Sequence, residues 1–445
     1  MTSSQHTGSV RSTTASRRTA SGRSRRSVLA AAVTAAALTL AACGSSGEGT
    51  PEATEDVPGI TDSTVKVGTH QPLTGPAAAG YASISPATKA YFDYVNANGG
   101  IHGRTIEYSV KDDGYNPANT QSVVRELVLQ DEVFAILGGL GTPPHSSVLD
   151  FLNDNEVPDL FVASGSPTWN QPEDYPYTYG FMQDYDTEAK VLATYVQEEF
   201  PDATYCLFGQ DDDFGADFKT GLESALGSGG LASSQVYSTA NTDVAAQISA
   251  MQAAGCDVNF LASINGFSAQ AIGTAAKLGY FPKWAASSAG GDYNTLASYL
   301  GENTDKLLEG FISANYLPSY SDADDEWTAK FKEINEEYNP GAEFDGNTIF
   351  GMSLGYLFAE ALNEAGENPT RESLLEALES GEVQGNGHVP LGFSEDSHAG
   401  YTGGMITLIS GGVQSYTGTP FAVDGDSVSA YTEDRPAMPQ NGIPE

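Results

Sequence analysis

The chain has 445 residues, which is enough for two or three domains with substantial cores, and it carries 20 Lys and Arg against 58 Asp and Glu. Residues 1–42 hold six Arg and no acid, which leaves 14 basic and 58 acidic residues beyond them. Such an acidic surface repels phosphate backbones and anionic lipid headgroups, so the composition excludes nucleic acid as a partner.

The first segment has the pattern of an export signal. Arg25-Arg26 precedes an apolar run at 28–42, which is too short for a comfortable membrane span. The run ends in Leu40-Ala41-Ala42-Cys43, which resembles a bacterial lipobox, where the cysteine is diacylated and becomes the mature N-terminus. We therefore predict a signal peptide at 1–42 and an exported lipoprotein anchored to the outer face of the cell membrane. The paired arginines leave general secretory and twin-arginine export both open.

Residues 43–63 are rich in Gly, Ser, Glu, Thr and Pro, which predicts a flexible tether. Apolar strand patterns then alternate with helical spacing, and we assign residues 64–182 to a first α/β lobe. Its clearest strands are at 133–137 and 157–163, where continuous apolar runs suit strands covered on both faces. This β-α-β order predicts a doubly wound parallel sheet with right-handed crossovers.

The alternation restarts near residue 203, and residues 183–313 are expected to form a second lobe of the same kind. Its first and third strands, near 205–208 and 258–261, would be neighbours in such a lobe. Cys206 and Cys256 would then lie close together and could form a disulfide in an oxidising compartment. No metal-ligand spacing involves either cysteine.

The last part of the chain returns to both lobes. We expect residues 314–385 to be return helices that belong mainly to the first lobe. Short β segments at 386–425 are assigned mainly to the second lobe, and the Pro- and Asp-rich residues 426–445 are expected to be irregular.

Patterns of catalytic chemistry are weak. Gly351-Met352-Ser353-Leu354-Gly355 matches the nucleophile elbow of hydrolases, but apolar residues run through it at helical spacing. There is no phosphate-binding G-x-x-x-x-G-K-[ST] motif, so any ATP hydrolysis must come from another subunit. The six His residues are scattered and form no H-x-x-x-H pair. We predict no catalytic residue, no metal and no cofactor, and therefore not an enzyme.

Several segments together resemble one known family. Asn98-Gly99-Gly100-Ile101-His102-Gly103-Arg104-Thr105-Ile106 is the clearest, and the stretches at 72–76, 112–113 and 138–142 fit at their spacing. They resemble the type I substrate-binding proteins of bacterial ABC importers, in the leucine/isoleucine/valine-binding branch. The resemblance covers roughly residues 64–425.

The resemblance implies two lobes joined by three crossover strands, with a ligand bound in the cleft by hinge closure. It implies a monomeric receptor that delivers a small-molecule ligand to an ABC permease served by a separate ATPase subunit. A sensor that uses the same fold to report the ligand to a membrane receptor is the alternative.

The binding positions of the first lobe follow from the same resemblance. Thr142, Ser164 and Ser166 lie in loops after strands, where their hydroxyls and the adjacent N–H groups would hold a ligand carboxylate. Tyr81 lies where the family often has an aromatic wall.

The second lobe supplies the other half of the implied site. Phe214 falls where a ring covers the ligand in the family. Asn265 and Phe267 follow the third strand of this lobe, and Ser288 follows the fourth.

One departure from the family concerns the ligand. Amino-acid binders of this family commonly have an acidic residue near the position of Ser288, where it pairs with the α-ammonium, but here no charge occurs before Asp292. A buried ammonium without a carboxylate would be poorly compensated. Asp212, Asp213 or Asp292 could substitute. Otherwise the ligand lacks an amine, so a branched-chain or related amino acid and an amine-free aromatic acid, other organic acid or amide both remain open.

Overall fold

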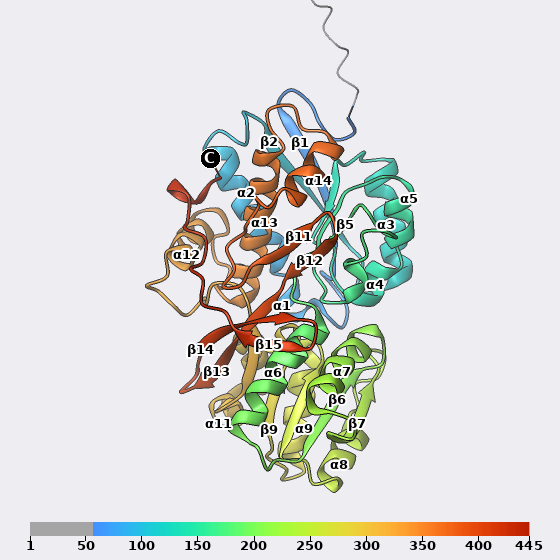
Figure 1. Ribbon diagram of the computed structural model, residues 1–445, viewed down its shortest axis with the longest axis vertical. Helices are drawn as coiled ribbons and strands as arrows, with labels where there is room; N and C mark the ends of the chain where they lie inside the picture. Colours follow the sequence, from blue (N-terminus) through green and yellow to red (C-terminus); the bar gives the residue numbers. More distant parts are fainter. Residues whose placement is uncertain (1–56, 445) are drawn as a thin grey trace, which may run out of the picture. The chain divides into compact units, whose positions relative to one another are not determined.

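The computed structural model describes residues 57–444. The predicted signal peptide, Cys43 and most of the predicted tether lie outside the described residues. The described part of the chain forms two α/β lobes, one coloured mainly blue to cyan and the other green to yellow (Figure 1). Within residues 57–444, no helix combines the length and the apolar character that a membrane span needs.

The first lobe contains a five-stranded parallel sheet in the order β2-β1-β3-β4-β5. Its central strands β3 and β4 are buried along their whole length, which explains their continuous apolar runs. The strands are β1 (Thr64–Gln71), β2 (Thr105–Asp112), β3 (Ala135–Leu137), β4 (Asp159–Val162) and β5 (Thr178–Gly180). The helices between them are α1 (Ala78–Tyr81), α2 (Ile84–Ala97), α3 (Pro117–Leu129), α4 (Thr142–Ser146) and α5 (Leu149–Asp154), with the short η1 (Pro167–Trp169) after β4.

Local sequence signals position these elements. Gly100, just after α2, has φ of 72°, and a Cβ there would lie 2.0 Å from the Arg104 carbonyl oxygen, so only glycine fits this tight turn. Asn116 caps α3 by accepting a hydrogen bond from the Ala118 N–H, and Pro117 occupies the first helical position.

The second lobe contains an eight-stranded sheet in the order β15-β14-β13-β10-β9-β8-β6-β7. Strands β6 to β10 are parallel, and β13 to β15 add an antiparallel extension at β10. The strands are β6 (Tyr205–Gln210), β7 (Leu231–Tyr237), β8 (Val258–Ala262), β9 (Lys283–Ala286), β10 (Ile312–Asn315), β13 (Gly403–Ser410), β14 (Val413–Asp424) and β15 (Ser427–Ala430). Its helices are α6 (Tyr185–Glu199), α7 (Asp213–Leu226), α8 (Ala245–Ala253), α9 (Asn265–Lys277), α10 (Tyr293–Leu300) and α11 (Thr304–Leu308), with the short η2 (Ser288–Gly290) and η3 (Gly301–Asn303).

The chain passes between the lobes three times. It leaves the first lobe between β5 and α6, returns after β10 so that α12 (Glu326–Tyr338) and α13 (Gly346–Glu364) pack on α2, and crosses again before β13. The hairpin β11 (Leu391–Ser394) and β12 (Ser397–Tyr401), which follows α14 (Arg371–Glu379), lies beside β5 in the first lobe. This arrangement confirms the predicted fold class of two doubly wound lobes joined by three crossovers. The tail that we expected to be irregular contains β15 and the short η4 (Gln440–Gly442).

The structure shows where the cysteine pair and the G-x-S-x-G segment lie. Strand β6 pairs in parallel with both β7 and β8, and a disulfide joins Cys206 to Cys256, whose Cα atoms are 5.8 Å apart. Ser353 lies inside α13, is buried, and accepts a hydrogen bond from Asn386 Nδ2 at 3.0 Å. A nucleophile elbow requires a strand-to-helix turn, so the G-x-S-x-G segment is not one.

Candidate ligand-binding site

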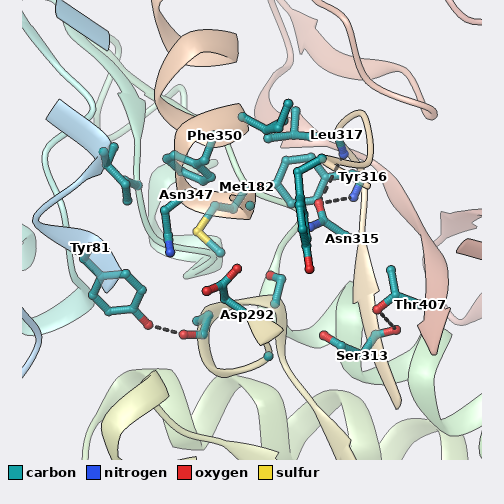
Figure 2. Close-up of a pocket in the computed structure, with 18 of the residues that line it drawn as sticks. Tyr81, Met182, Asp292, Ser313, Asn315, Tyr316, Leu317, Asn347, Phe350 and Thr407 are labelled. Carbon is teal, nitrogen blue, oxygen red and sulfur yellow. Dashed lines mark hydrogen bonds between the residues drawn. The ribbon is translucent and has the colours of Figure 1, made fainter. Parts of the chain in front are cut away.

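A cavity that is partly open to solvent lies between the two lobes (Figure 2). Its first-lobe wall comes from the ends of four elements: Tyr81 ends α1, Tyr115 follows β2, Leu140 and Gly141 follow β3, and Ala163 follows β4. The carboxyl ends of the parallel strands therefore face this cavity. Open α/β sheets commonly bind their ligands at this end of the strands.

The second lobe supplies the facing wall. Phe214 from the start of α7 and Ile264 after β8 line the cavity, together with Ser288 at the start of η2 and Asp292 after it. The second crossover closes one side with the segment 315–320, which runs from the end of β10.

The returning part of the chain completes the enclosure. Asn347 and Phe350 of α13 project into the cavity, and Gln414 and Tyr416 of β14 also line it (Figure 2 labels the first two). These residues, Tyr185 and the second crossover were not among the predicted binding positions. Their contribution depends on the packing of elements that are far apart in the chain, and no local motif marks them.

Three of the eight predicted binding residues line the cavity: Tyr81, Phe214 and Ser288. Thr142 and Ser164 lie one layer behind it. Both are buried, their hydroxyl oxygens are 2.7 Å apart, and both hydrogen-bond to the phenol of Tyr185, which lines the cavity.

The other three predicted residues make contacts within the protein and are not among the residues that line the cavity. The hydroxyl of Ser166 donates a hydrogen bond to Asp217 Oδ2 of α7 at 2.8 Å, across the two lobes. Asn265 Oδ1 accepts a hydrogen bond from the Asp292 N–H at 3.2 Å, so it orients that residue. Phe267 stacks on Tyr237, with ring centroids 4.2 Å apart.

Asp292 is the charged residue of this cavity. Its side chain is directed into the cavity (Figure 2), and the residue is 9% exposed. Oδ1 accepts hydrogen bonds from the Thr295 N–H at 2.8 Å and from the Thr295 hydroxyl at 2.5 Å, whereas Oδ2 finds no hydrogen-bond partner among the described residues. Burial raises the pKa of Asp292, the hydrogen bonds from Thr295 and the backbone of Gly346 oppose that shift, and the negative charge of Glu343 adds to it. Among the residues of 57–444 that line the cavity, none is Lys, Arg or His.

The phenols of the cavity are neutral hydrogen-bond donors near pH 7. Burial raises the pKa of Tyr185 to about 12, although hydrogen bonds with Ser164, the Gly165 backbone and Thr142 lower it. Burial also raises the pKa values of Tyr81 and Tyr115. A neutral phenol can donate to a carboxylate, so this side of the cavity suits an anionic group without any basic residue.

Direct contacts hold the lobes together around the cavity. The Tyr81 hydroxyl donates a hydrogen bond to the Ala289 carbonyl oxygen, and Gln210 Nε2 donates to the Tyr115 hydroxyl at 3.3 Å. In both pairs the residues come from opposite lobes. These contacts bridge the two lobes at the edge of the cavity.

Residues 64–412 match the family described as periplasmic binding protein, which is more than three quarters of the chain. This chain belongs to the periplasmic binding protein family. The membership confirms the predicted resemblance, including the leucine/isoleucine/valine-binding branch, and it makes solute binding rather than catalysis the activity of the family.

Relatives of this periplasmic binding protein are distant in sequence. It is 24% identical over 202 residues to the Leu/Ile/Val-binding protein homolog 3 of Brucella melitensis, which covers 44% of this chain and 53% of that protein. The chain therefore spans about half the length of the curated relative it matches.

Solved structures establish the fold over most of the chain. A branched-chain amino acid ABC transporter protein from Thermus thermophilus with bound valine has a TM-score of 0.72 at 22% identity, with coverage of 82% of this chain and 98% of that one. A fatty acid ABC transporter substrate-binding protein from Thermomonospora curvata has a TM-score of 0.73 at 22% identity, with coverage of 84% and 96%.

Proposed function

We propose that this periplasmic binding protein captures a small amino acid or a closely related zwitterion, and that the ligand ammonium pairs with Asp292. The observation that carries the proposal is the buried carboxylate at the wall of the cavity, whose Oδ2 has no hydrogen-bond partner within residues 57–444. An isolated buried carboxylate costs several kcal/mol unless a cation pairs with it. Because no basic side chain lines the described cavity, the ligand is the natural source of that cation.

The opposite end of a zwitterion also finds suitable partners. The Tyr185 and Tyr115 hydroxyls are neutral donors on the first-lobe side of the cavity, and Thr142 and Ser164 back the Tyr185 phenol. We assign the ligand carboxylate to this hydroxyl-rich side. Ile264, Leu140 and Phe350 then offer an apolar surface to the ligand side chain.

An amine-free organic acid is the alternative ligand class, and the name of the Thermomonospora curvata relative includes a fatty acid. Such a ligand would place a second negative charge in the cavity that already contains Asp292, without a basic residue to compensate either one. A neutral amide would leave the Asp292 carboxylate unpaired. Both alternatives fit the charge balance less well than a zwitterion does.

A thermal-shift comparison of matched ligand pairs tests the proposal. The soluble domain is heated with L-leucine or 4-methylpentanoate, and with L-phenylalanine or 3-phenylpropanoate. A ligand that binds only the folded state raises the melting temperature. We expect a shift with an amino acid and none with the deaminated partner of the same shape. Equal shifts within a pair, or shifts with the acids alone, would overturn the role of Asp292.

We further propose that the protein is a lipid-anchored receptor that delivers its ligand to an ABC permease. The lipobox at Cys43 and the family membership support this location and role. Replacement of Cys43 by Ser should release the protein from the membrane fraction into the medium. A permease-deletion strain that loses uptake of the ligand would support transport, whereas unchanged uptake with a lost transcriptional response would support the sensor alternative.

A further inference from the structure

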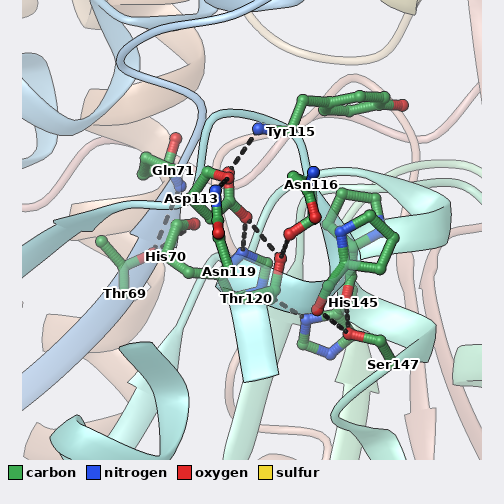
Figure 3. A network of polar contacts seen from close by, with 12 residues as sticks. Thr69, His70, Gln71, Asp113, Tyr115, Asn116, Asn119, Thr120, His145 and Ser147 are labelled. Atoms are coloured by element: carbon green, nitrogen blue, oxygen red, sulfur yellow. Dashed lines mark hydrogen bonds and ion pairs between the residues drawn. The ribbon is translucent and has the colours of Figure 1, made fainter. Parts of the chain in front are cut away.

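Four buried side chains behind the first-lobe wall of the cavity are joined end to end by hydrogen bonds, and Figure 3 shows three of them, Asp113, His70 and His145. Asp113 Oδ2 is 2.8 Å from His70 Nδ1, His70 Nε2 is 3.0 Å from His145 Nδ1, and His145 Nε2 is 2.8 Å from Asp159 Oδ2. All four residues are 0% exposed. They lie in line rather than around a point, and among the described residues no group of His, Cys, Asp and Glu has the arrangement of a metal site.

The number of protons in this chain follows from its three hydrogen bonds. Each bond needs one proton, whichever atom carries it, so the chain needs three. Two neutral imidazoles supply only two, which would leave two lone pairs facing each other at 3.0 Å or less. One further proton completes the chain, which then has a net charge of −1 with two carboxyl groups.

The surroundings place this third proton at one end of the chain. Asp113 also accepts hydrogen bonds from the Tyr115 N–H at 2.8 Å and the Thr120 hydroxyl at 3.0 Å, which stabilises an ionised carboxylate. Asp159 accepts one from the Thr178 hydroxyl at 3.0 Å, and its Oδ1 has no partner within residues 57–444. Because more donors reach Asp113 than Asp159, the hydrogen-bond geometry assigns the third proton to the bond between His145 and Asp159.

Residues of this hydrogen-bonded group also contact the segments that form the first-lobe wall. Asp113 holds the N–H of Tyr115, a wall residue whose φ of 58° is rare for a side chain of this size. His145 lies in α4, and its N–H donates a hydrogen bond to the carbonyl oxygen of Gly141 in the wall. The His70 carbonyl oxygen accepts a hydrogen bond from the N–H of Leu140, also in the wall.

We propose that Asp113, His70, His145 and Asp159 act as a three-proton positioning unit, which holds the first-lobe wall in its ligand-binding shape and weakens when the third proton is lost. The effect on ligand affinity rests on the proposed function. The effect on the wall does not depend on the proposed function, so the test uses the protein without ligand.

The groups that face the unit define its pH dependence. Burial lowers the pKa of His70, and Asp113 opposes that shift, which agrees with a third proton held at the other end. The Tyr115 phenol, in the loop before α3, is the further titratable group that interacts with Asp113. Thr120 of α3, Thr178 of β5 and Trp169 of η1 also pack against the unit, and none of them titrates.

Replacement of Asp159 by Asn tests the proton count. An asparagine amide donates to His145 where the protonated Asp159 would, so all three hydrogen bonds form without the extra proton. With a third proton in the unit, the wild-type fold would bind one more proton than its unfolded chain above the unfolded His pKa, and the unit's contribution to stability would fall as pH rises. Between about pH 7 and 9, we expect the ratio of the wild-type unfolding equilibrium constant to that of Asp159→Asn to increase about tenfold for each pH unit.

Urea unfolding at a series of pH values measures both slopes. Asp184, Glu188 and Glu360, whose pKa values burial raises to about 7, titrate nearby, but they are present in both proteins and cancel in the difference. Equal slopes would overturn the third proton.

Hydrogen exchange of the ligand-free protein tests the positioning role. Asp159→Leu cannot donate to His145, so we expect amide exchange at 113–116 and 138–145 to speed up by about tenfold or more, while Asp159→Asn restores slow exchange. Thr88→Val is the matched control, because Thr88 is also buried in the first lobe, where its hydroxyl donates to the Gly351 carbonyl oxygen rather than to the unit. Faster exchange spread over the whole lobe in Asp159→Leu, or the same pattern in the control, would overturn the role of the unit.

Discussion

The two lobes differ in whether the buried polar groups near the cavity have hydrogen-bond partners within the protein. Behind the first-lobe wall, the side chains of Asp113, His70, His145 and Asp159 hydrogen-bond to one another. In the second-lobe wall, Ser288 Oγ and Asp292 Oδ2 have no partner among the described residues. The four side chains behind the first-lobe wall therefore find partners within the protein, whereas we propose that the ligand supplies the missing partner of Asp292 in the second-lobe wall.

Asp159 and Asp292 make the lesson specific, because each is a buried carboxylate with one unpartnered oxygen. Asp159 has the His145 imidazole as a hydrogen-bond partner at 2.8 Å, whereas Asp292 lines the cavity. An unpartnered oxygen therefore marks a ligand site only when a cavity adjoins it and no internal group supplies the missing charge.

The largest expected effect follows from Asp292→Asn. If the ligand ammonium pairs with this carboxylate, its removal should weaken amino-acid binding by about 2–4 kcal/mol, or about 30- to 1000-fold, by calorimetric titration. The stability of the unliganded protein should not fall, because asparagine also caps α10 and the buried charge is gone. Asp213→Asn is the control, since this exposed acid starts α7 and does not line the cavity. Equal losses in both variants would contradict the pairing.

The second lobe has a disulfide, whereas the unit in the first lobe is held by hydrogen bonds, and we expect the disulfide to affect stability rather than ligand affinity. Replacement of both Cys206 and Cys256 by Ser opens a loop with a sequence separation of 50 residues. We expect a loss of about 2–4 kcal/mol in unfolding free energy by urea denaturation. Ligand affinity should hardly change, because the bond lies at the amino ends of β6 and β8, away from the cavity. A large loss of affinity would contradict this division.

Much of this architecture was visible in the sequence. Continuous apolar runs at β3 and β4 and the stop after α2 predict the first lobe, because these signals are local. Thr142 and Ser164 follow strands as predicted, but Tyr185 covers them, and its contribution depends on where the first crossover places α6.

Other parts of the site have no local signal. His70 and His145 are 75 positions apart, so spacing rules that look for close histidines miss their contact. Asn347 and Phe350 reach the cavity only because α13 returns to pack on α2. Asp292 was one of three acids that the sequence left open, and only the cavity distinguishes it from Asp212 and Asp213.

Glu188 in the second lobe should make its own contribution to the pH dependence of stability, distinct from that of the first-lobe unit. Burial raises the pKa of Glu188 to about 7, although hydrogen bonds from Ser287, Ser288 and Gln183 lower it. Because the folded pKa exceeds the unfolded value, this residue's contribution to stability is fully present below about pH 4.5 and is lost as pH rises through about 7. Glu188→Gln should remove about 2–3 kcal/mol of this pH dependence in urea unfolding. An unchanged profile would show that Glu188 is ionised throughout.

The smallest expected effect concerns lobe closure. Tyr81→Phe removes the hydroxyl that donates to the Ala289 carbonyl oxygen of the other lobe. We expect ligand binding to weaken by about 1 kcal/mol, or about fivefold, because the closed state loses one hydrogen bond. Tyr299→Phe, at a tyrosine that is 49% exposed, is the control and should leave affinity unchanged. Unaltered affinity in Tyr81→Phe would mean that this contact does not favour closure.

The most direct test of the central claim is a crystal structure of the protein with the ligand found by the thermal-shift comparison. We predict a ligand nitrogen within hydrogen-bond distance of Asp292 Oδ2, with its carboxylate near the Tyr185 and Tyr115 hydroxyls. A ligand that places hydrocarbon or its own carboxylate against Asp292, with no cationic group near Oδ2, would contradict the account.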